Sequence, residues 1–246
     1  MDLICEERPS DSPFVETIWR SRSEQAGPFI SIAESQYSLV VTKYRGRAFM
    51  TVRGPSTHAA PAFTPADAEF LGIQFKPGVF LQHLPPALVA QRNDISLPEA
   101  SSDSFWLQQA AWQYPDFENV DSFVDRLARG GMLVADPLVT QVLHREPVDA
   151  TVRTLRRHFL YAAGMPYGSL FQIERARYAT LLLKQGAPIQ DAVYRAGYFD
   201  QPHLTRSLKQ YIGLTPAQIS DETSRQPLSF LYKTTPLNRT MMQISG

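Results

Sequence analysis

Residues 189–216 read IQDAVYRAGYFDQPHLTRSLKQYIGLTP, and this stretch decides the fold of the C-terminal third of the chain. Its apolar residues predict a short helix over 189–196, followed by a sharp turn at Gly197. Asp200 is a good N-cap for a second helix, because its carboxylate can accept a hydrogen bond from a free backbone N–H. A helix, a glycine turn and a capped second helix form the layout of a helix-turn-helix unit, which binds DNA.

The pattern of the capped second helix occurs once more, 49 residues earlier in the chain. Thr151, Leu155, Arg157, Phe159 and Gly164 correspond in this order to Asp200, Leu204, Arg206, Leu208 and Gly213. In each copy an N-cap is followed by apolar anchors four and eight positions later, and a glycine ends the helix. A connecting helix is expected over 167–185, roughly 30 Å long at 1.5 Å per residue. That length is similar to the ~34 Å between successive major grooves, so the repeat predicts two recognition helices.

The side opposite the apolar anchors carries residues suited to DNA in both predicted recognition helices. They are Arg153, Thr154, Arg156 and Arg157 in the first copy, and Gln201, His203, Thr205, Arg206 and Lys209 in the second. Arg and Gln can read base edges in a major groove, while Lys and Thr suit phosphates. Other roles stay open: Asp200 as a cap alone, and His203 as a surface residue or a neighbour of phosphate. Arg157 and Arg206 either bind phosphate or brace the fold through a carboxylate such as Asp191.

The first copy departs from the second ahead of its recognition helix. Only residues 138–149 are available between Asp136-Pro137 and Thr151, and Pro147 interrupts them. We therefore expect an abbreviated supporting helix in the first unit, which leaves open whether this unit contacts bases, and a complete second unit.

The N-terminal half has a strand pattern. Short segments rich in Val, Ile, Phe, Tyr and Thr lie between Gly- and Pro-containing turns, at 14–19, 37–44, 48–53 and 69–75. Many short strands with frequent turns favour an antiparallel barrel or sandwich. Apolar residues at helical spacing then predict helices over 105–112 and 120–127. The expected domains are a β-rich sensor or dimerisation domain over 1–135, a helical DNA-binding domain over 136–220, and a tail over 221–246.

Charge is distributed unevenly along the chain. The 246 residues carry 24 Lys and Arg against 24 Asp and Glu, but residues 1–135 have a balance of −5 and residues 136–220 a balance of +4. An acidic sensor joined to a basic phosphate-binding module has this distribution. The start of the chain lacks the basic and apolar regions of a signal peptide, and no apolar run reaches the ~20 residues of a membrane span. A cytoplasmic protein is expected.

Catalytic motifs are not apparent in the sequence. The front half offers only His58 and His83 as histidines, without a His-x-His pair, so neither a metal site nor a cofactor is predicted. The sequence has no phosphate-binding glycine loop and no nucleophile elbow. Cys5 is the only cysteine and has no obvious activating neighbour other than Arg8. We therefore do not expect an enzyme.

Residues 151–159, 164–166 and 189–216 resemble the AraC/XylS family of bacterial transcription regulators, a resemblance that covers about 138–219, roughly a third of the chain. Residues 69–78, EFLGIQFKPG, resemble a segment of the cupin-like β-barrel domains fused to some of these regulators. The resemblance implies an α+β protein. Its N-terminal part would be an antiparallel β-barrel or sandwich with flanking helices, and its C-terminal part an all-α double helix-turn-helix domain.

The expected function is sequence-specific binding of double-stranded DNA in transcription regulation. A small-molecule effector in the β-rich domain and a second copy of the chain are further expected partners, and no membrane is. The alternative is a cupin-type enzyme or a DNA-repair protein with an accessory helix-turn-helix module. A third hypothesis is an interaction module whose first unit has lost DNA binding.

Overall fold

The computed structural model describes residues 3–90, 94–221 and 227–229, and the chain forms two compact units. The first, here called the sheet unit, comprises Met1–Gly27, Gln36–Pro55 and Thr64–Pro166. The second, here called the helical unit, comprises Pro28–Ser35, Ser56–Phe63 and Tyr167–Gly246. Two short segments from the N-terminal half therefore belong to the same unit as the C-terminal helices.

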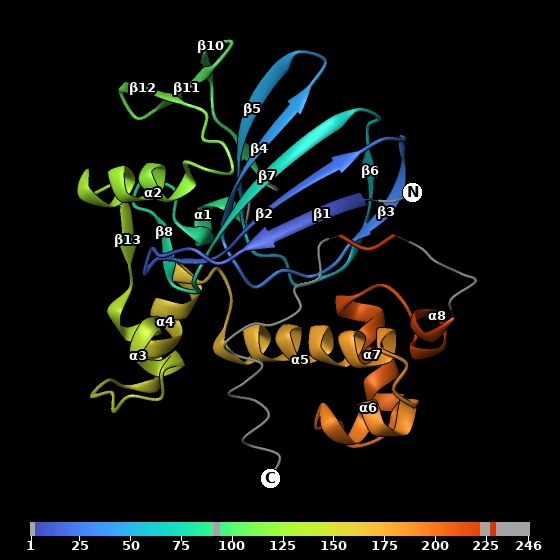
Figure 1. Cartoon of the computed structure of the whole chain (residues 1–246). Coiled ribbons are helices and arrows are strands. Elements are labelled where there is room, and N and C mark those ends of the chain that lie inside the picture. Colours follow the sequence, from blue (N-terminus) through green and yellow to red (C-terminus); the bar gives the residue numbers. More distant parts are fainter. Residues whose placement is uncertain (1–2, 91–93, 222–226, 230–246) are drawn as a thin grey trace. The chain divides into compact units, whose positions relative to one another are not determined.

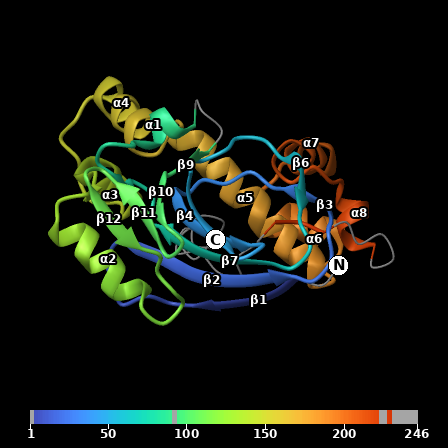
Figure 2. The ribbon, with the colours of Figure 1, turned by 90° about the horizontal axis from the view of Figure 1, so that it is seen from above.

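A six-stranded antiparallel sheet forms the centre of the sheet unit, and its strands β1, β2, β7, β4 and β5 lie side by side in Figure 1. The order across the sheet is β1 (Leu3–Arg8), β2 (Val15–Ser23), β7 (Ala68–Phe75), β4 (Ser38–Tyr44), β5 (Arg47–Arg53) and β9 (Ile95–Ser96). The view from above shows the same succession of β1, β2 and β7 (Figure 2). All four strands predicted from the sequence are therefore confirmed.

Smaller elements complete the sheet unit. β8 (Val79–Leu81) pairs with β13 (Leu133–Ala135), and β10 (Glu99–Ser101), β11 (Ser104–Leu107) and β12 (Ala110–Gln113) form a second antiparallel sheet. The helices are α1 (Pro86–Val89), α2 (Val120–Arg129), α3 (Pro137–Leu143) and α4 (Val152–Ala162). One face of the large sheet is strongly apolar, since Ile18, Leu39, Met50, Val52 and Ile73 are all buried.

The helix expected over 105–112 is wrong, because these residues form the β11–β12 hairpin. Phe105 is paired with Trp112, and Gln108 has a φ of 55° in the turn. Phe105 and Leu107 are buried while Trp106 between them is exposed, which is the period of a strand. Eight residues are too few for apolar spacing to separate a helix from a hairpin. The helix expected over 120–127 is confirmed as α2, which ends at Gly130 and Gly131.

The α+β class is confirmed, with antiparallel sheets in the N-terminal part and helices in the C-terminal part. Among the described residues, the order of the large sheet begins at β1 and ends at β9 without closing on itself. The cupin-like character of this region remains a prediction.

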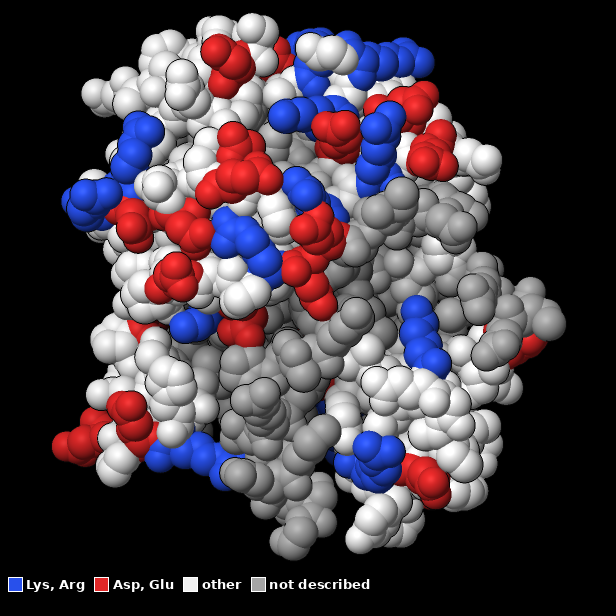
Figure 3. All heavy atoms as spheres, viewed as in Figure 1, with Lys and Arg blue, Asp and Glu red and all other residues white. Residues whose placement is uncertain are grey.

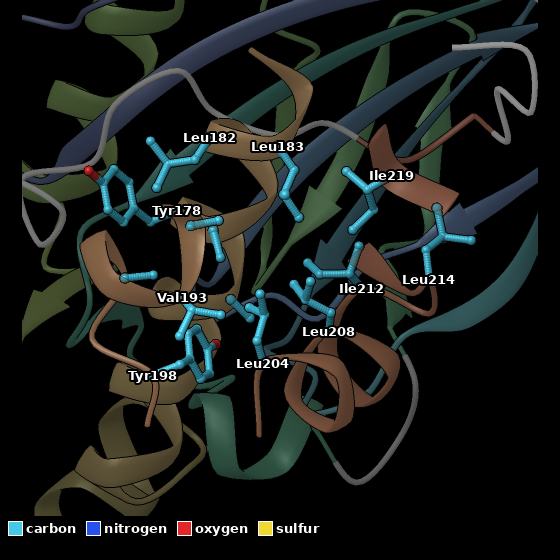
Figure 4. Close-up of a cluster of buried hydrophobic side chains, with 14 of the residues drawn as sticks. Tyr178, Leu182, Leu183, Val193, Tyr198, Leu204, Leu208, Ile212, Leu214 and Ile219 are labelled. Atoms are coloured by element: carbon cyan, nitrogen blue, oxygen red, sulfur yellow. The ribbon is translucent and has the colours of Figure 1, made fainter. Parts of the chain in front are cut away.

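The helical unit contains α5 (Tyr167–Lys184), α6 (Ile189–Arg195), α7 (Gln201–Tyr211) and α8 (Pro216–Ser220). Their apolar side chains point toward one another in a single cluster, which Figure 4 shows with Leu182 and Leu183 of α5, Val193 of α6, and Leu204 and Leu208 of α7. The long connecting helix predicted from the sequence is confirmed as α5. A short two-stranded sheet, β3 (Gly27–Ser31) and β6 (Ala60–Thr64), also contributes residues to this unit.

The segments Pro28–Ser35 and Ser56–Phe63 are bound to the end of α7. The backbone N–H of Ala33 donates to the carbonyl of Tyr211 at 2.7 Å, and that of Ala59 donates to the carbonyl of Gln210 at 2.9 Å. These bonds satisfy carbonyls that a helix leaves free at its C-terminal end. Ile32 is part of the hydrophobic cluster of the C-terminal helices. The sequence did not indicate this contribution.

The division into domains at 135/136 and 220/221 remains a prediction, and the compact units divide the chain at other points. Most of the predicted tail over 221–246 lies outside the described residues. Residues 227–229 of the tail pair with β3, where Ile30 donates its N–H to the Pro227 carbonyl at 2.9 Å.

Candidate nucleic-acid interface

The helix-turn-helix predicted over residues 189–211 is present as α6, a turn and α7. Gly197 has a φ of 68°, a left-handed conformation that glycine adopts at little cost. Asp200 caps α7, since its Oδ1 accepts a hydrogen bond from the N–H of His203 at 2.7 Å. Gly213, with a φ of 84°, follows the end of α7. The turn, the N-cap and the end of this helix that the sequence predicts are therefore confirmed.

The turn is held by Tyr198, which is buried between α5 and α7. The guanidinium of Arg175 in α5 lies over the Tyr198 ring, and its Nη1 donates to the Gly197 carbonyl at 3.3 Å. The Tyr198 hydroxyl is 2.8 Å from Oγ of Ser207 in α7. Burial raises the pKa of Tyr198 above its ordinary value, although the Ser207 hydrogen bond and the Arg175 charge act in the opposite direction. The orientation of α7 is therefore fixed by both the turn and α5.

Four of the residues predicted to bind DNA lie on the outward face of α7. Gln201, Arg206 and Lys209 are exposed, and Thr205 is half-buried beside them. Oγ1 of Thr205 donates to the Gln201 carbonyl at 2.8 Å, so its lone pairs remain available to a further hydrogen-bond donor. His203 lies differently, because its ring packs edge-on against Tyr198 with centroids 5.1 Å apart. The structure thus groups Gln201, Thr205, Arg206 and Lys209, and it places His203 against the turn.

The first recognition helix, α4, belongs to the sheet unit. Thr151 caps it, because its Oγ1 accepts the N–H of Thr154 at 3.2 Å. Arg153, Arg156 and Arg157 are exposed along one side, as predicted. The Thr154 hydroxyl is 3.0 Å from that of Thr151, so Thr154 belongs to the cap. α4 is a capped helix with three arginines on its outward face.

Contacts inside the sheet unit position α4. The buried side of the helix includes Phe159, and its Tyr161 ring packs edge-on against Phe80 with centroids 5.6 Å apart. His158 Nδ1 is 2.7 Å from Oδ2 of Asp136. The other carboxylate oxygen of Asp136 caps α3 by accepting the N–H of Val139 at 3.1 Å. One aspartate therefore links the two helices of the first helix-turn-helix.

The supporting helix of the first unit is not shorter than that of the second, contrary to the expectation from the sequence. α3 and α6 each have seven residues. The connection to the recognition helix differs instead, with eight residues over 144–151 against five over 196–200. Pro147 lies in this connection rather than in the helix. An offset of 49 residues from α6 predicts a helix that begins at residue 140. The longer connection places α3 three positions earlier, so the offset does not reveal it.

Neither Arg157 nor Arg206 forms an ion pair with a carboxylate in the part of the chain that the structure describes. Both side chains are exposed. The bracing role through Asp191 that the sequence left open for them is therefore not seen in this structure.

Charged side chains on the face of the described surface that Figure 3 shows are mixed in sign. On the face drawn in Figure 3, Lys and Arg side chains are interspersed with Asp and Glu side chains in the upper part. Within 3–90, 94–221 and 227–229, no group of three His, Cys, Asp or Glu side chains is arranged to hold a metal ion. No helix in the same residues is long and apolar enough to cross a membrane.

Two capped recognition helices, each preceded by a supporting helix and each with basic residues on its outward face, define a helix-turn-helix DNA-binding domain. Residues 147–222 match a family model described as "Helix-turn-helix domain", so this part of the chain is a helix-turn-helix domain of the AraC type. The match confirms the resemblance seen in the sequence. It supports a DNA-binding transcription regulator whose helix-turn-helix domain lies within residues 147–222.

No curated protein is similar enough in sequence to match the chain. Among solved structures, the chain is similar to ToxT from Vibrio cholerae, with 10% identity and a TM-score of 0.37 over 87% of this chain and 97% of that one. A similarity of this size does not transfer the role of any residue.

Proposed function

We propose that the protein binds a specific site in double-stranded DNA through α4 and α7, and that a small molecule bound in the β-rich region controls this binding. The observation that carries the proposal is the outward face of α7. Gln201 stands at the start of a capped helix, where recognition helices contact base edges. Thr205, Arg206 and Lys209 continue the same face.

Each of these residues has a distinct role in the proposal. Gln201 reads a base, since a glutamine amide can bond both the N6 and the N7 of adenine. Arg206 and its equivalent Arg157 in α4 bind phosphates, because both are exposed and carry no ion pair within the described residues. Arg153 and Arg156 of α4 face outward and suit guanine, the base that arginine contacts most often.

The test of the base-reading role is the double variant Gln201→Ala, Thr205→Ala of the full chain. A preferred duplex is first selected from a random pool with the unaltered protein. We expect the variant to lose affinity for that duplex by a factor of about 10 to 100, and to lose far less for random DNA. Gln185→Ala, an exposed glutamine beyond α5, is the matched control. Equal losses on selected and random duplexes would contradict the proposal.

The phosphate role is tested by salt dependence. Arg157→Ala and Arg206→Ala should each reduce the slope of log affinity against log salt concentration by about one, and leave sequence preference unchanged. A changed preference with an unchanged slope would assign these arginines to bases.

Control by a small molecule is supported by a pocket of about 390 Å³ in the sheet unit, a volume typical of ligand sites. Val41, Leu71 and Phe117 supply apolar lining, and basic residues such as Lys43 and acidic residues such as Glu69 supply charge of both signs. β4, which carries Val41 and Lys43, follows closely after the segment Pro28–Ser35. That segment is hydrogen-bonded to Tyr211 of α7 through Ala33. A ligand that moves β4 would therefore act on a segment held by the recognition helix.

This part of the proposal is tested with a panel of small amphipathic acids and amines, by thermal shift and then by DNA binding with and without each hit. Leu71→Arg, which fills the pocket, should abolish the ligand effect. Hits that bind in this pocket but leave DNA affinity unchanged would reject control from this site.

The proposal includes a cytoplasmic location, where bacterial DNA is accessible, and formation of a homodimer. Sedimentation equilibrium of the full chain, with and without the selected duplex, tests the dimer. A strictly monomeric protein on DNA would remove this part of the proposal.

A further inference from the structure

The two recognition helices share one set of outward positions. Counted from the N-cap, the first, second, fifth, sixth, ninth and tenth residues face outward in both helices. In α4 they are Val152, Arg153, Arg156, Arg157, Leu160 and Tyr161, and in α7 they are Gln201, Pro202, Thr205, Arg206, Lys209 and Gln210. All of them are exposed except Thr205, which is half-buried. The helix α4 lies in the sheet unit and α7 in the helical unit, yet both expose the same positions. These positions are therefore a property of the helix-turn-helix motif and do not depend on what packs around one helix.

The third position is excluded from the outward set in both helices. Thr154 is hydrogen-bonded to the cap residue Thr151, and His203 packs against Tyr198 in the turn. The same position thus stabilises the start of each helix. The outward positions are the ones left to determine which bases each helix prefers.

The chemistry at these positions differs between the helices. The first position is the apolar Val152 in α4 and the amide Gln201 in α7, and the fifth is Arg156 in α4 and Thr205 in α7. Only the sixth position is the same, with Arg157 and Arg206. Two helices with such different outward faces cannot prefer the same base sequence.

Val152 is the most exposed apolar residue of the outward set. It is 83% exposed, at the first position of a capped helix, where leaving an apolar side chain in water gives no packing stabilisation. A recognition helix places its N-terminal residues against base edges in the major groove. The one apolar group that a base presents there is the 5-methyl group of thymine.

We propose that Val152 is a specificity-determining residue that contacts the methyl group of a thymine beside guanines read by Arg153 or Arg156. The DNA site is accordingly asymmetric: α4 binds a half containing thymine and guanine, and α7 binds a half containing adenine opposite Gln201. This inference rests on the proposed function and specifies the DNA sequence that it requires.

The experiment uses the full chain and a duplex selected from a random pool, in which each thymine is replaced in turn by deoxyuridine, which lacks only the methyl group. One replacement should weaken binding of the unaltered protein by about fourfold, the factor expected when one methyl group leaves a buried contact. Val152→Ala should bind the thymine and deoxyuridine duplexes equally. Val152→Thr, which keeps a methyl group, should retain part of the difference.

A second arm exchanges the chemistry of the equivalent positions. Val152→Gln should change the preferred base at that one position from thymine to adenine, with the remaining positions unchanged. Because Val152 is exposed, the variants should unfold at the same temperature as the unaltered protein, which separates a binding effect from loss of folding.

The possible outcomes separate this inference from the proposed function. If the unaltered protein selects no sequence, both fail. The proposed function stands if the unaltered protein selects a site that depends on Gln201. The role of Val152 is nevertheless overturned if every deoxyuridine replacement changes the affinity of the unaltered protein and of Val152→Ala equally, and if Val152→Gln selects the original site.

Discussion

The guanidinium of Arg175 lies over the ring of Tyr198, with Cζ 4.1 Å from the ring centroid. This contact joins α5 to the turn that precedes the recognition helix α7. A cation over an aromatic face contributes about 0.5–2 kcal/mol, depending on its exposure to water. The Tyr198 hydroxyl continues the connection to Ser207 inside α7. One arginine therefore fixes the direction from which α7 presents its outward face.

Replacing Arg175 should disturb DNA recognition without touching DNA. Arg175→Met removes the ring contact and the hydrogen bond to the Gly197 carbonyl. We expect the free energy of unfolding to fall by about 1–2 kcal/mol, and specific affinity to fall more than affinity for random DNA. Urea denaturation and duplex titration measure the two effects. Arg195→Met, at an exposed site in α6, should change stability by less than about 0.5 kcal/mol. Equal stability of both variants would show that the ring contact is unimportant.

Gly213 is predicted to be essential for packing of the N-terminal segments against α7. It has a φ of 84°, and a Cβ there would lie 3.1 Å from Cγ2 of Ile30 and 3.3 Å from Cβ of Ala59. Gly186 has the same φ of 84°, but nothing lies within 4 Å of its Cβ position. Gly186→Ala should therefore cost only backbone strain, about 1 kcal/mol, and Gly213→Ala about 2–3 kcal/mol. Identical losses in thermal or urea unfolding would contradict the packing of Ile30 and Ala59 on this turn.

The local features of the helical unit could be predicted because they depend on neighbouring residues. The caps at Thr151 and Asp200, the turn at Gly197 and the length of α5 follow from side-chain hydrogen bonds and backbone conformations within a few positions. The binding of 28–35 and 56–63 to α7 joins residues about 150 or more apart in the chain, and no local pattern encodes it. The hairpin over 104–113 was missed for another reason, since its apolar spacing suits a short helix equally well.

The candidate site could be predicted only in part from the sequence. Arg153, Arg156, Arg157, Gln201, Thr205, Arg206 and Lys209 were correctly expected on the outward faces of their helices. Thr154 contacts the cap and His203 contacts the turn, and DNA binding by these two polar residues stays a prediction. The sequence pattern does not single out Val152 as a DNA contact, because apolar residues are usually buried. The 49-residue repeat offered a signal for it, because Val152 is the equivalent of Gln201.

A buried cation on α5 predicts strong destabilisation when it is removed. Arg177 is 2% exposed and donates to the Ala33 carbonyl at 2.9 Å, and Glu174 is fully buried and accepts a hydrogen bond from Ser35. The Nη1 of Arg177 lies 3.5 Å from Oε2 of Glu34, so Arg177→Met leaves this largely buried carboxylate without its cation, and we expect a loss of about 3–5 kcal/mol. Glu34→Gln combined with Arg177→Met should cost less than the sum of the single changes, as for two groups that interact. Strict additivity in urea unfolding would show that the two charges are not coupled.

Asp121 of α2 should make the free energy of unfolding decrease at acidic pH. Burial acts to raise the pKa of its carboxyl, but hydrogen bonds from Ser10 and Arg8 and the Arg8 charge outweigh burial, so the pKa is lowered below the ordinary value of 3.8. Arg8 Nη1 is 2.8 Å from Oδ2 of Asp121. A carboxyl whose folded pKa is depressed stabilises the folded state above its unfolded pKa, and this contribution is lost as pH falls through the folded pKa.

The pH dependence is measured as the difference in the free energy of unfolding between the unaltered protein and Asp121→Asn. The difference should be constant from pH 7 to about pH 5, shrink below about pH 4, and vanish where both states bind the proton. Asp125→Asn, at an exposed site on the same helix, controls for the loss of one negative charge. Using the difference removes the contributions of other carboxyls, which both proteins share. If the difference stayed the same from pH 7 to pH 2, the Arg8 and Ser10 contacts would not stabilise the ionised form of Asp121.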